Sequence, residues 1–338
     1  MESFFDLTQK ELEDLLVRCK NEKYRAKQLL RWVYNKGIFD FDSMTDISKN
    51  LRSLFREMFF FDFMEPESIE KSKDGSTKFA FRTKDGHIVE TVLMPEVKRT
   101  TLCVSTQIGC KMGCKFCVTG QVGFIRNLRT SEIISQIMTV RRLISVQITN
   151  VVLMGMGEPL DNLENVKKAI EIMGNPYGMN LSKRKITLST VGLLDGLKHI
   201  PPQSCVIAIS LNAADEEKRT YLMPINRVYP LTEILNFAKN LKLKKRERIT
   251  FEYVLIKDIN DSKEDAEKLA DILSGIKCKI NLIPYNESPY LPFKSPREND
   301  VYAFQRILLK NRYTATVRKS KGQDVFAACG QLGSRYLM

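Results

Sequence analysis

The sequence contains very little histidine and no long apolar run. Its two histidines, His87 and His199, are isolated and far apart, so neither belongs to the paired motif that completes many zinc sites. No apolar stretch approaches the roughly 20 residues that cross a bilayer. The first residues, MESFFDLTQKELEDLL, lack the basic and then apolar layout of a signal peptide. These absences predict a soluble, cytoplasmic protein with no membrane partner.

Positive charge, by contrast, is abundant. The chain of 338 residues has 53 Lys and Arg against 40 Asp and Glu, which gives a net charge of +13. Nucleic acid releases counterions when Lys and Arg replace them, so RNA or DNA is one partner that this charge suits. A basic solvated surface explains the same charge equally well. The hydrophobic content of 43% is enough for a sizeable core, divided into one large α/β domain and a smaller one, or into two domains.

The first hundred residues change from a helical to a strand-like pattern. Apolar residues recur at helical spacing in LTQKELEDLLVRC, behind a possible cap at Thr8, and in KYRAKQLLRWVYNKG and ISKNLRSLFREMF. TKFAFRT and HIVETVLM alternate like strands, with Asp-Gly turn signals near them. We therefore expect a helical accessory domain over residues 1–65 and a connecting β-hairpin segment over residues 66–98.

From about residue 100 short apolar runs alternate with amphipathic helical segments. The runs include TLCVSTQI, NVVLMGMG, RKITLST, CVIAISL, RITFEYVLI and CKINLIPY, and they form six strand–helix units. Such alternation predicts a parallel sheet, and six units are fewer than the eight of a closed barrel. We expect an α/β fold, a partial (β/α)6 TIM-like barrel over residues 99–312, followed by a strand and a tail over residues 313–338. Chemistry in such folds gathers at the carboxyl ends of the strands.

Three of the eight cysteines follow the first of these strands with the spacing C-x3-C-x2-C. They are Cys110, Cys114 and Cys117, with Phe116 just before the last. Thiolates are soft ligands that suit zinc or iron–sulfur clusters. A purely structural role is the alternative: three buried cysteines, or a zinc site completed by Cys103. Three thiolates without a fourth protein ligand suit a [4Fe-4S] cluster that leaves one iron open to a small molecule.

The cysteine motif and several other segments together resemble the RlmN/Cfr family of radical S-adenosylmethionine (SAM) RNA methyltransferases. The segments are GCKMGCKFCVTGQVGFIRNL, MGMGEPLDN, ITLSTVG, SLNAADEEKR, MPINRVYP, NLIPYN and VRKSKGQDVFAACGQL, and the likeness spans about residues 20 to 335. The resemblance implies the radical SAM fold and one [4Fe-4S] cluster per subunit with three cysteine ligands. It also implies two SAM molecules per turnover and an electron donor such as flavodoxin or ferredoxin.

The resemblance also implies which strand-end residues bind SAM. Glycines permit close backbone approach, and a carboxylate can accept hydrogen bonds from a ligand ammonium. Hydroxyl and amide groups at later strand ends suit ribose hydroxyls or a carboxylate. One departure is that the family typically has His where this chain has Asn212, which keeps polar donors and acceptors. The residues at the matching positions are Gly157, Glu158, Ser189, Ser210, Leu211, Asn212 and Asn286.

Two further cysteines and one glutamate take catalytic roles by the same resemblance. Carbon 2 of adenine is not nucleophilic, so the family methylates a cysteine first, at the position of Cys329. Hydrogen abstraction from that S-methyl group then gives a carbon radical that joins protein and RNA covalently. Cys103 matches the thiol that releases the methylated base by forming a transient disulfide with Cys329. Glu90 matches the proposed proton acceptor.

The implied substrates are an adenosine of the peptidyl-transferase centre in 23S rRNA and adenosine 37 of tRNAs, in a protein for which nothing demands more than a monomer. Methylation of carbon 8, as in the Cfr branch, is the nearest alternative, but Pro159 in GMGEP and the IPYN segment favour carbon 2. A second alternative is a noncatalytic RNA-binding protein with an iron–sulfur site. Basic clusters for RNA contact are Lys98-Arg99, Arg126 with Arg129, Lys183-Arg184-Lys185, residues 242–248, and Arg318-Lys319-Ser320-Lys321.

Overall fold

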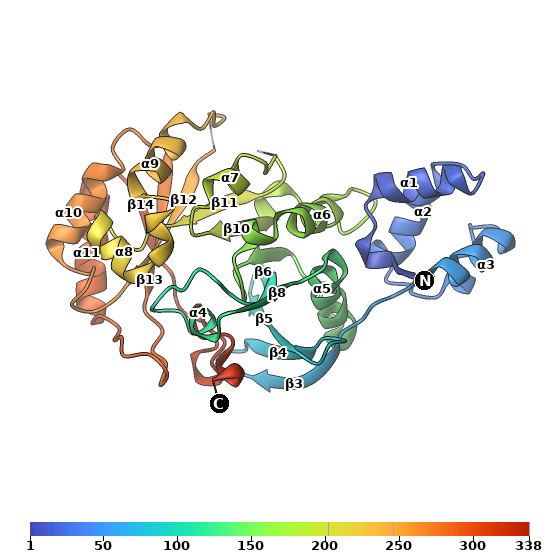
Figure 1. Cartoon of the computed structure of the whole chain (residues 1–338), viewed down its shortest axis with the longest axis horizontal. Coiled ribbons are helices and arrows are strands. Elements are labelled where there is room, and N and C mark those ends of the chain that lie inside the picture. The colour runs from blue at the N-terminus through green and yellow to red at the C-terminus, as the bar shows by residue number, and fades with distance from the viewer. Residues whose placement is uncertain (202, 246, 338) are drawn as a thin grey trace.

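A helical amino-terminal lobe and a larger α/β lobe make up the chain (Figure 1). The computed structural model describes residues 1–201, 203–245 and 247–337. The α-helices of these residues are α1 (Gln9–Arg18), α2 (Arg25–Leu30), α3 (Lys49–Met58), α4 (Val118–Val122), α5 (Thr130–Ile144), α6 (Leu163–Gly174), α7 (Leu194–Leu197), α8 (Glu216–Leu222), α9 (Leu231–Asn240), α10 (Lys263–Ile272) and α11 (Glu298–Lys310). None of them is long and apolar enough to span a membrane.

Fourteen strands are described, most of them in one sheet. They are β1 (Glu2–Ser3), β2 (Phe59–Phe60), β3 (Glu65–Lys71), β4 (Thr77–Arg82), β5 (Ile88–Glu96), β6 (Arg99–Cys103), β7 (Gln107–Gly109), β8 (Phe124–Asn127), β9 (Asn150–Leu153), β10 (Ile186–Thr190), β11 (Val206–Ser210), β12 (Ile249–Leu255), β13 (Cys278–Pro284) and β14 (Thr314–Val317). The ten-stranded sheet has the order β14-β13-β12-β11-β10-β9-β6-β5-β4-β3, and its strands from β6 to β14 run parallel.

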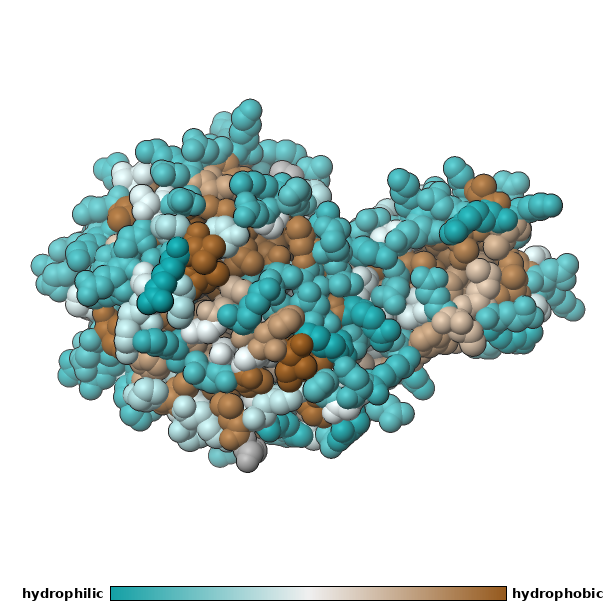
Figure 2. Space-filling model, viewed as in Figure 1, coloured by the Kyte–Doolittle hydropathy of each residue, from teal (hydrophilic) through white to brown (hydrophobic). Residues whose placement is uncertain are grey.

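The amino-terminal lobe forms where the helical periodicity predicts it. Thr8 caps α1 in a capping box with Glu11, whose carboxylate accepts the Thr8 N–H at 2.9 Å. Aromatic rings fill the centre of this lobe: Phe4 lies edge-on to Phe59, and Phe5 lies edge-on to Phe63. Figure 2 shows this lobe set apart from the larger one, and shows a mainly hydrophilic face with apolar residues over the middle of the larger lobe.

The predicted hairpin segment extends the sheet of the barrel. β3, β4, β5 and β6 pair antiparallel in succession, and β6 then pairs with β9 in parallel. The Asp85-Gly86 turn between β4 and β5 places Gly86 at a φ of +86°, which glycine adopts without strain. The division of the chain at residues 65, 98 and 312 stays a proposal, and the continuous sheet joins residues 66–98 closely to the barrel.

The barrel is open, because β14 and β3 are edge strands with no partner across the gap among the described residues. The predicted partial barrel is thus confirmed. Its parallel strands all end at the same edge of the sheet, so the loops that follow them meet there. The carboxyl-terminal tail lies beside α4 and the β3–β4 region (Figure 1), where the Tyr336 hydroxyl donates to the Ile88 carbonyl of β5 at 2.8 Å. The tail therefore closes over the same end of the sheet.

Candidate active site

A cleft of about 160 Å3, open to solvent, lies at the carboxyl ends of the parallel strands. Its wall brings together ten of the residues predicted from the sequence: Cys110, Cys114, Cys117, Gly157, Glu158, Ser189, Ser210, Asn212, Asn286 and Cys329. The side chain of Leu211 is instead fully buried in the core, so only its backbone is near the cleft.

The loop that carries the three clustered cysteines is closed at its base by a short two-stranded sheet. β7 and β8 pair antiparallel on either side of the loop, and the Cys110 N–H donates to the Gly123 carbonyl at 2.8 Å. Gly109 has a φ of +72°, and a Cβ there would overlap the Gly123 carbonyl oxygen. The close approach of these two backbone segments therefore requires glycine.

The three cysteines line the cleft as largely buried thiols that form no disulfide. Burial raises the pKa of Cys110 to about 12 and that of Cys114 well above its usual value. Among the described residues, no three Cys, His, Asp or Glu side chains are arranged to hold a single metal ion. Cys103 does not line this cleft but lines a neighbouring cavity. Three soft thiols spread around a cleft fit a multinuclear iron–sulfur cluster.

The Gly157-Glu158 pair follows β9 and lines the same cleft as these thiols. Glu158 is buried, and its two carboxylate oxygens accept the N–H groups of Val191 at 2.9 Å and Leu160 at 3.1 Å. Burial still raises the pKa of Glu158 to about 7. Gly157 has a φ of +97°, and a Cβ there would clash with the side chain of Gln107. The segment is held rigidly at a position where a buried carboxylate can meet a ligand ammonium.

Polar side chains at the next two strand ends are held by the strands around them. The Ser189 hydroxyl donates to Glu252 of β12 at 2.7 Å. Asn212 has a φ of +57°, and its side-chain oxygen accepts the Val254 N–H at 2.9 Å. Left-handed backbone is several-fold enriched in Asn and in His alike, which accounts for Asn at a position where the family has His. Ser210 also lines the cleft, at the end of β11.

A second cavity adjoins the cleft and is lined by the two cysteines to which the family resemblance gives catalytic roles. Cys103 at the end of β6 and Cys329 in the tail line it together, with Arg318 shared between the two cavities. Burial and the neighbouring Cys329 raise the pKa of Cys103 to about 12, against the charge of Arg318. Asn286 donates to the Cys329 carbonyl at 3.0 Å and so ties the tail to the end of β13.

Glu90 lies beside this second cavity but is covered by the tail. Alternation along β5 places Glu90 on the same face as Val92, which lines the cavity. The carboxylate is 1% exposed and accepts the Gly333 N–H of the tail at 2.7 Å. Burial raises the pKa of Glu90, while Lys78, Gly333 and Arg335 oppose that shift. The carboxylate therefore lies on the face of the sheet that borders the second cavity, where burial and nearby cations act on its pKa in opposite directions.

Two charged residues that line the cleft, Glu252 and Arg318, are absent from the site predicted from the sequence. Glu252 is buried in the middle of β12. Glu252 could have been recognised from the sequence, because it is the one carboxylate in the apolar segment ITFEYVL. A buried carboxylate needs a hydrogen-bond or ion-pair partner, and often it has a function. Arg318 stands in a basic cluster predicted to contact phosphate, and the structure directs its side chain into both cavities.

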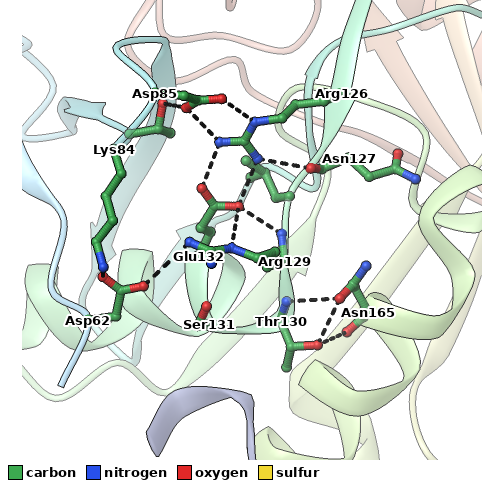
Figure 3. A network of polar contacts seen from close by, with 12 residues as sticks. Asp62, Lys84, Asp85, Arg126, Asn127, Arg129, Thr130, Ser131, Glu132 and Asn165 are labelled. Carbon is green, nitrogen blue, oxygen red and sulfur yellow. Dashed lines mark hydrogen bonds and ion pairs between the residues drawn. The ribbon is translucent and has the colours of Figure 1, made fainter. Parts of the chain in front are cut away.

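The other basic clusters lie away from the cleft. Figure 3 shows Arg126 paired with Asp85 at 2.6 Å and with Glu132 at 2.8 Å, in a network that fixes β8 to the β4–β5 turn and to α5. Lys183, Arg184 and Arg248 line a separate cavity at the amino ends of β10 to β13. The cluster at residues 242–248 includes Arg246, which is outside the described residues.

Comparisons with known proteins agree with this geometry. Residues 104–271 match the family model of the radical SAM superfamily, and residues 3–60 match that of the ribosomal RNA large subunit methyltransferase N-terminal domain. The dual-specificity RNA methyltransferase RlmN of Desulfotalea psychrophila is 44% identical over 340 residues, covering 97% of this chain and 94% of the relative. The probable dual-specificity RNA methyltransferase RlmN of Aquifex aeolicus is 47% identical over 344 residues, covering 100% and 99%.

A solved structure gives the same result for the fold. A radical SAM methyltransferase from Sphaerobacter thermophilus superposes with a TM-score of 0.90 at 40% identity, covering 98% of this chain and 99% of that one. The predicted fold class and enzyme class are confirmed. Both the sequence relatives and the structural relative cover nearly the whole chain, the helical lobe included. The chain belongs to the RlmN family of radical SAM RNA methyltransferases.

Proposed function

We propose that this chain transfers a methyl group from SAM to carbon 2 of adenosine, in the peptidyl-transferase centre of 23S rRNA and at adenosine 37 of tRNAs. The observation that carries the proposal is the cleft itself. The three cysteines and Glu158 line this one cleft, and Cys329 lines both the cleft and the second cavity. Ordinary methyl transfer from SAM needs a nucleophilic target and none of these thiols, whereas carbon 2 of adenine is not nucleophilic.

The residues of the cleft fit both cofactors. Cys110, Cys114 and Cys117 would hold a [4Fe-4S] cluster, which when bound supplies the electron that makes a hydrogen-abstracting radical from SAM. Glu158 would accept hydrogen bonds from the SAM ammonium, and Gly157 leaves room for close approach of the backbone. The remaining contacts would come from Ser189, Ser210, Leu211, Asn212 and Asn286. An external donor such as flavodoxin or ferredoxin would supply the electron.

Cys329 would carry the methyl group. Its thiolate takes the methyl of a first SAM as a thioether, and this thioether is then positioned in the cleft for hydrogen abstraction during use of a second SAM. The placement of Cys329 at the boundary of the two cavities supports this role, since it faces the cofactor cleft on one side and Cys103 on the other. Arg318 lines both cavities and places a positive charge near both thiols.

Cys103 and Glu90 would complete the reaction. The radical adduct would lose one electron, which the [4Fe-4S] cluster could take back, and Glu90 would take the proton from carbon 2, which restores the aromatic ring. The Cys103 thiolate would then attack the Cys329 sulfur. The sulfur–carbon bond to the RNA breaks, the released carbon keeps the electron pair and takes up a proton to become the methyl group, and a Cys103–Cys329 disulfide remains. Two electrons from an external thiol reductant restore both thiols. The two thiols share one cavity, and Glu90 lies on the same face of the sheet.

Mass spectrometry of nucleosides from cells with and without the gene tests the proposal. Loss of 2-methyladenosine from 23S rRNA and tRNA on deletion is the expected result. Loss of 8-methyladenosine would reassign the chain to the carbon-8 branch. Unchanged levels of both nucleosides would favour a noncatalytic RNA-binding protein with an iron–sulfur site. Analysis of each RNA separately shows whether one substrate or both depend on this chain, which we expect to act as a monomer.

A further inference from the structure

A row of charged and reactive side chains crosses the antiparallel part of the sheet. Strand register places Glu70 of β3 opposite Lys78 of β4, Lys78 opposite Val92 of β5, and Val92 opposite Cys103 of β6. Directly opposed residues share a face, so all four side chains lie on the side covered by the tail. Glu90 is on this same face, two residues from Val92 along β5. The row links the thiol Cys103 to a buried ammonium.

Lys78 is almost completely buried, which is unusual for lysine. It is 3% exposed, and its Nζ lies 3.5 Å from Glu70 and 3.7 Å from Glu90. Burial of an ammonium costs several kcal/mol unless partners compensate it. Glu70 already has a second cation, because Arg335 of the tail donates to it at 2.8 Å. The two carboxylates and two cations therefore form one compensated cluster, joining three elements of the sheet and tail.

Glu90 is the carboxylate of this cluster that has an oxygen without a hydrogen-bond partner among the described residues. Its Oε2 accepts the Gly333 N–H, but its Oε1 is buried and has no hydrogen-bond partner among the described residues. Arg335 is 3.9 Å away and is already engaged by Glu70 and Ser68. Lys78 is the nearest cation to the unpartnered oxygen. Without it, a carboxylate this deeply buried would take up a proton rather than stay charged.

We propose that Lys78 is a positioning residue: its buried ammonium favours the ionised form of Glu90 and, through the Glu90–Gly333 hydrogen bond, holds the tail that carries Cys329 against the sheet. The inference rests on the proposed function in that Glu90 is the base of the reaction. It adds that one lysine outside both cavities controls the charge of the base and the placement of the methyl-carrying cysteine. A carboxylate accepts an N–H far more strongly when ionised, so both effects have one cause.

The first test is the pH dependence of turnover. Groups facing Glu90 are Lys78, Glu70, Arg335 and Tyr336. Lys78→Met removes the charge that opposes burial, so the pKa of Glu90 rises and the acidic limb of the rate profile moves to higher pH. An opposite charge at this distance shifts a pKa by about 1–3 units, so the limb should move by at least about one unit. Lys78→Arg retains the charge and restores the limb.

A matched control lies on the same strand. Arg82 of β4 pairs with Glu67 of β3 at 2.8 Å, but both side chains are exposed. Arg82→Met therefore breaks a cross-strand ion pair without touching the cluster, and its profile keeps the wild-type limb. A Lys78→Met profile of unchanged shape, reduced equally at every pH, would overturn the proposal, since it would reduce Lys78 to a packing role.

The second test needs neither cofactor nor RNA. Hydrogen exchange of the tail amides, that of Gly333 above all, is measured at neutral pH in wild type, Lys78→Met, Glu90→Gln and the double variant. Lys78→Met should speed exchange of residues 329–337 at least about tenfold, and in the Glu90→Gln background it should add nothing, because the charge it compensates is gone. Equal additional exchange in that background would overturn the inference.

The two tests separate the inference from the function on which it depends. If Glu90→Gln turns over normally, Glu90 is not the base and the base assignment of the proposed function fails. The exchange test then decides alone, and a tail that Lys78→Met leaves unaffected would overturn the inference. If Glu90→Gln is inactive and the limb stays fixed in Lys78→Met, the base role survives and the role of Lys78 fails.

Discussion

The two ends of the parallel sheet carry cavities of opposite character. At the carboxyl ends, thiols, hydroxyls, amides and buried carboxylates line the cleft. At the amino ends of β10 to β13, a separate cavity is lined by basic and apolar residues, and Glu247 there pairs with Lys183 at 2.7 Å. Both ends contain cysteine and glutamate, yet only one end combines them with convergent polar groups. Cysteine and glutamate alone therefore do not identify a functional site; their position at the carboxyl ends of the strands does.

The largest expected difference between the two ends concerns cysteine. Cys114→Ala should abolish turnover and lower the iron bound after anaerobic reconstitution, because a cluster loses one of three ligands. Cys205→Ala, which removes a buried thiol from the cavity at the amino ends, should leave iron content and turnover unchanged. Iron analysis and the absorbance of the reconstituted proteins check both. Equal iron loss in the two variants would show that the Cys114 effect is one of folding.

A smaller difference is expected for glutamate. Glu158→Gln removes the charge of the carboxylate that would meet the SAM ammonium, and hydrogen bonds to charged groups contribute about 1.5–3 kcal/mol. SAM affinity, measured by equilibrium dialysis, should fall at least about tenfold. Glu247→Gln breaks only the partly exposed pair with Lys183, which is worth about 0–1 kcal/mol, and should leave SAM affinity unchanged. SAM binding by Glu158→Gln at wild-type affinity would remove Glu158 from the site.

The smallest effect is expected from the basic residues of the cavity at the amino ends. Lys198 and Lys279 line that cavity, at the opposite end of the sheet from the clustered cysteines. The double variant Lys198→Gln and Lys279→Gln should leave the turnover rate, the RNA affinity and its salt slope unchanged, because we expect neither lysine to contact phosphate; each lost phosphate contact would instead lower the salt slope by about one. Filter binding at several salt concentrations checks this. A fall in turnover comparable to that of Cys114→Ala would mean that both ends serve the reaction.

Much of this arrangement could be predicted because it depends on local pattern. β–α alternation predicted the barrel, and strand-end motifs placed Glu158, Ser189 and Ser210 at one edge, where the structure shows them lining one cleft. Leu211 could not be placed in this way, since its neighbours in the triplet face the cleft while its side chain faces the core.

Contacts between distant segments were beyond the reach of the sequence. Arg126 was a candidate for RNA contact, yet Asp85 and Glu132 engage it, and those residues meet only through the tertiary fold (Figure 3). The buried pair of Lys78 and Glu90 also depends on the register of two strands, and the hydrogen bond from Gly333 depends on the path of the tail. Such partners are set by packing, which no local pattern encodes.

The proposed pairing of Cys103 with Cys329 predicts a covalent protein–RNA intermediate that accumulates when Cys103 is removed. Cys103→Ala should purify with RNA attached covalently, because the thiol that releases the methylated base is missing. Mass spectrometry of the digested adduct should locate one methylene bridge between the Cys329 sulfur and carbon 2 of an adenosine. Isolation of RNA-free Cys103→Ala protein that turns over at the wild-type rate would show that Cys103 is not the thiol that releases the methylated base.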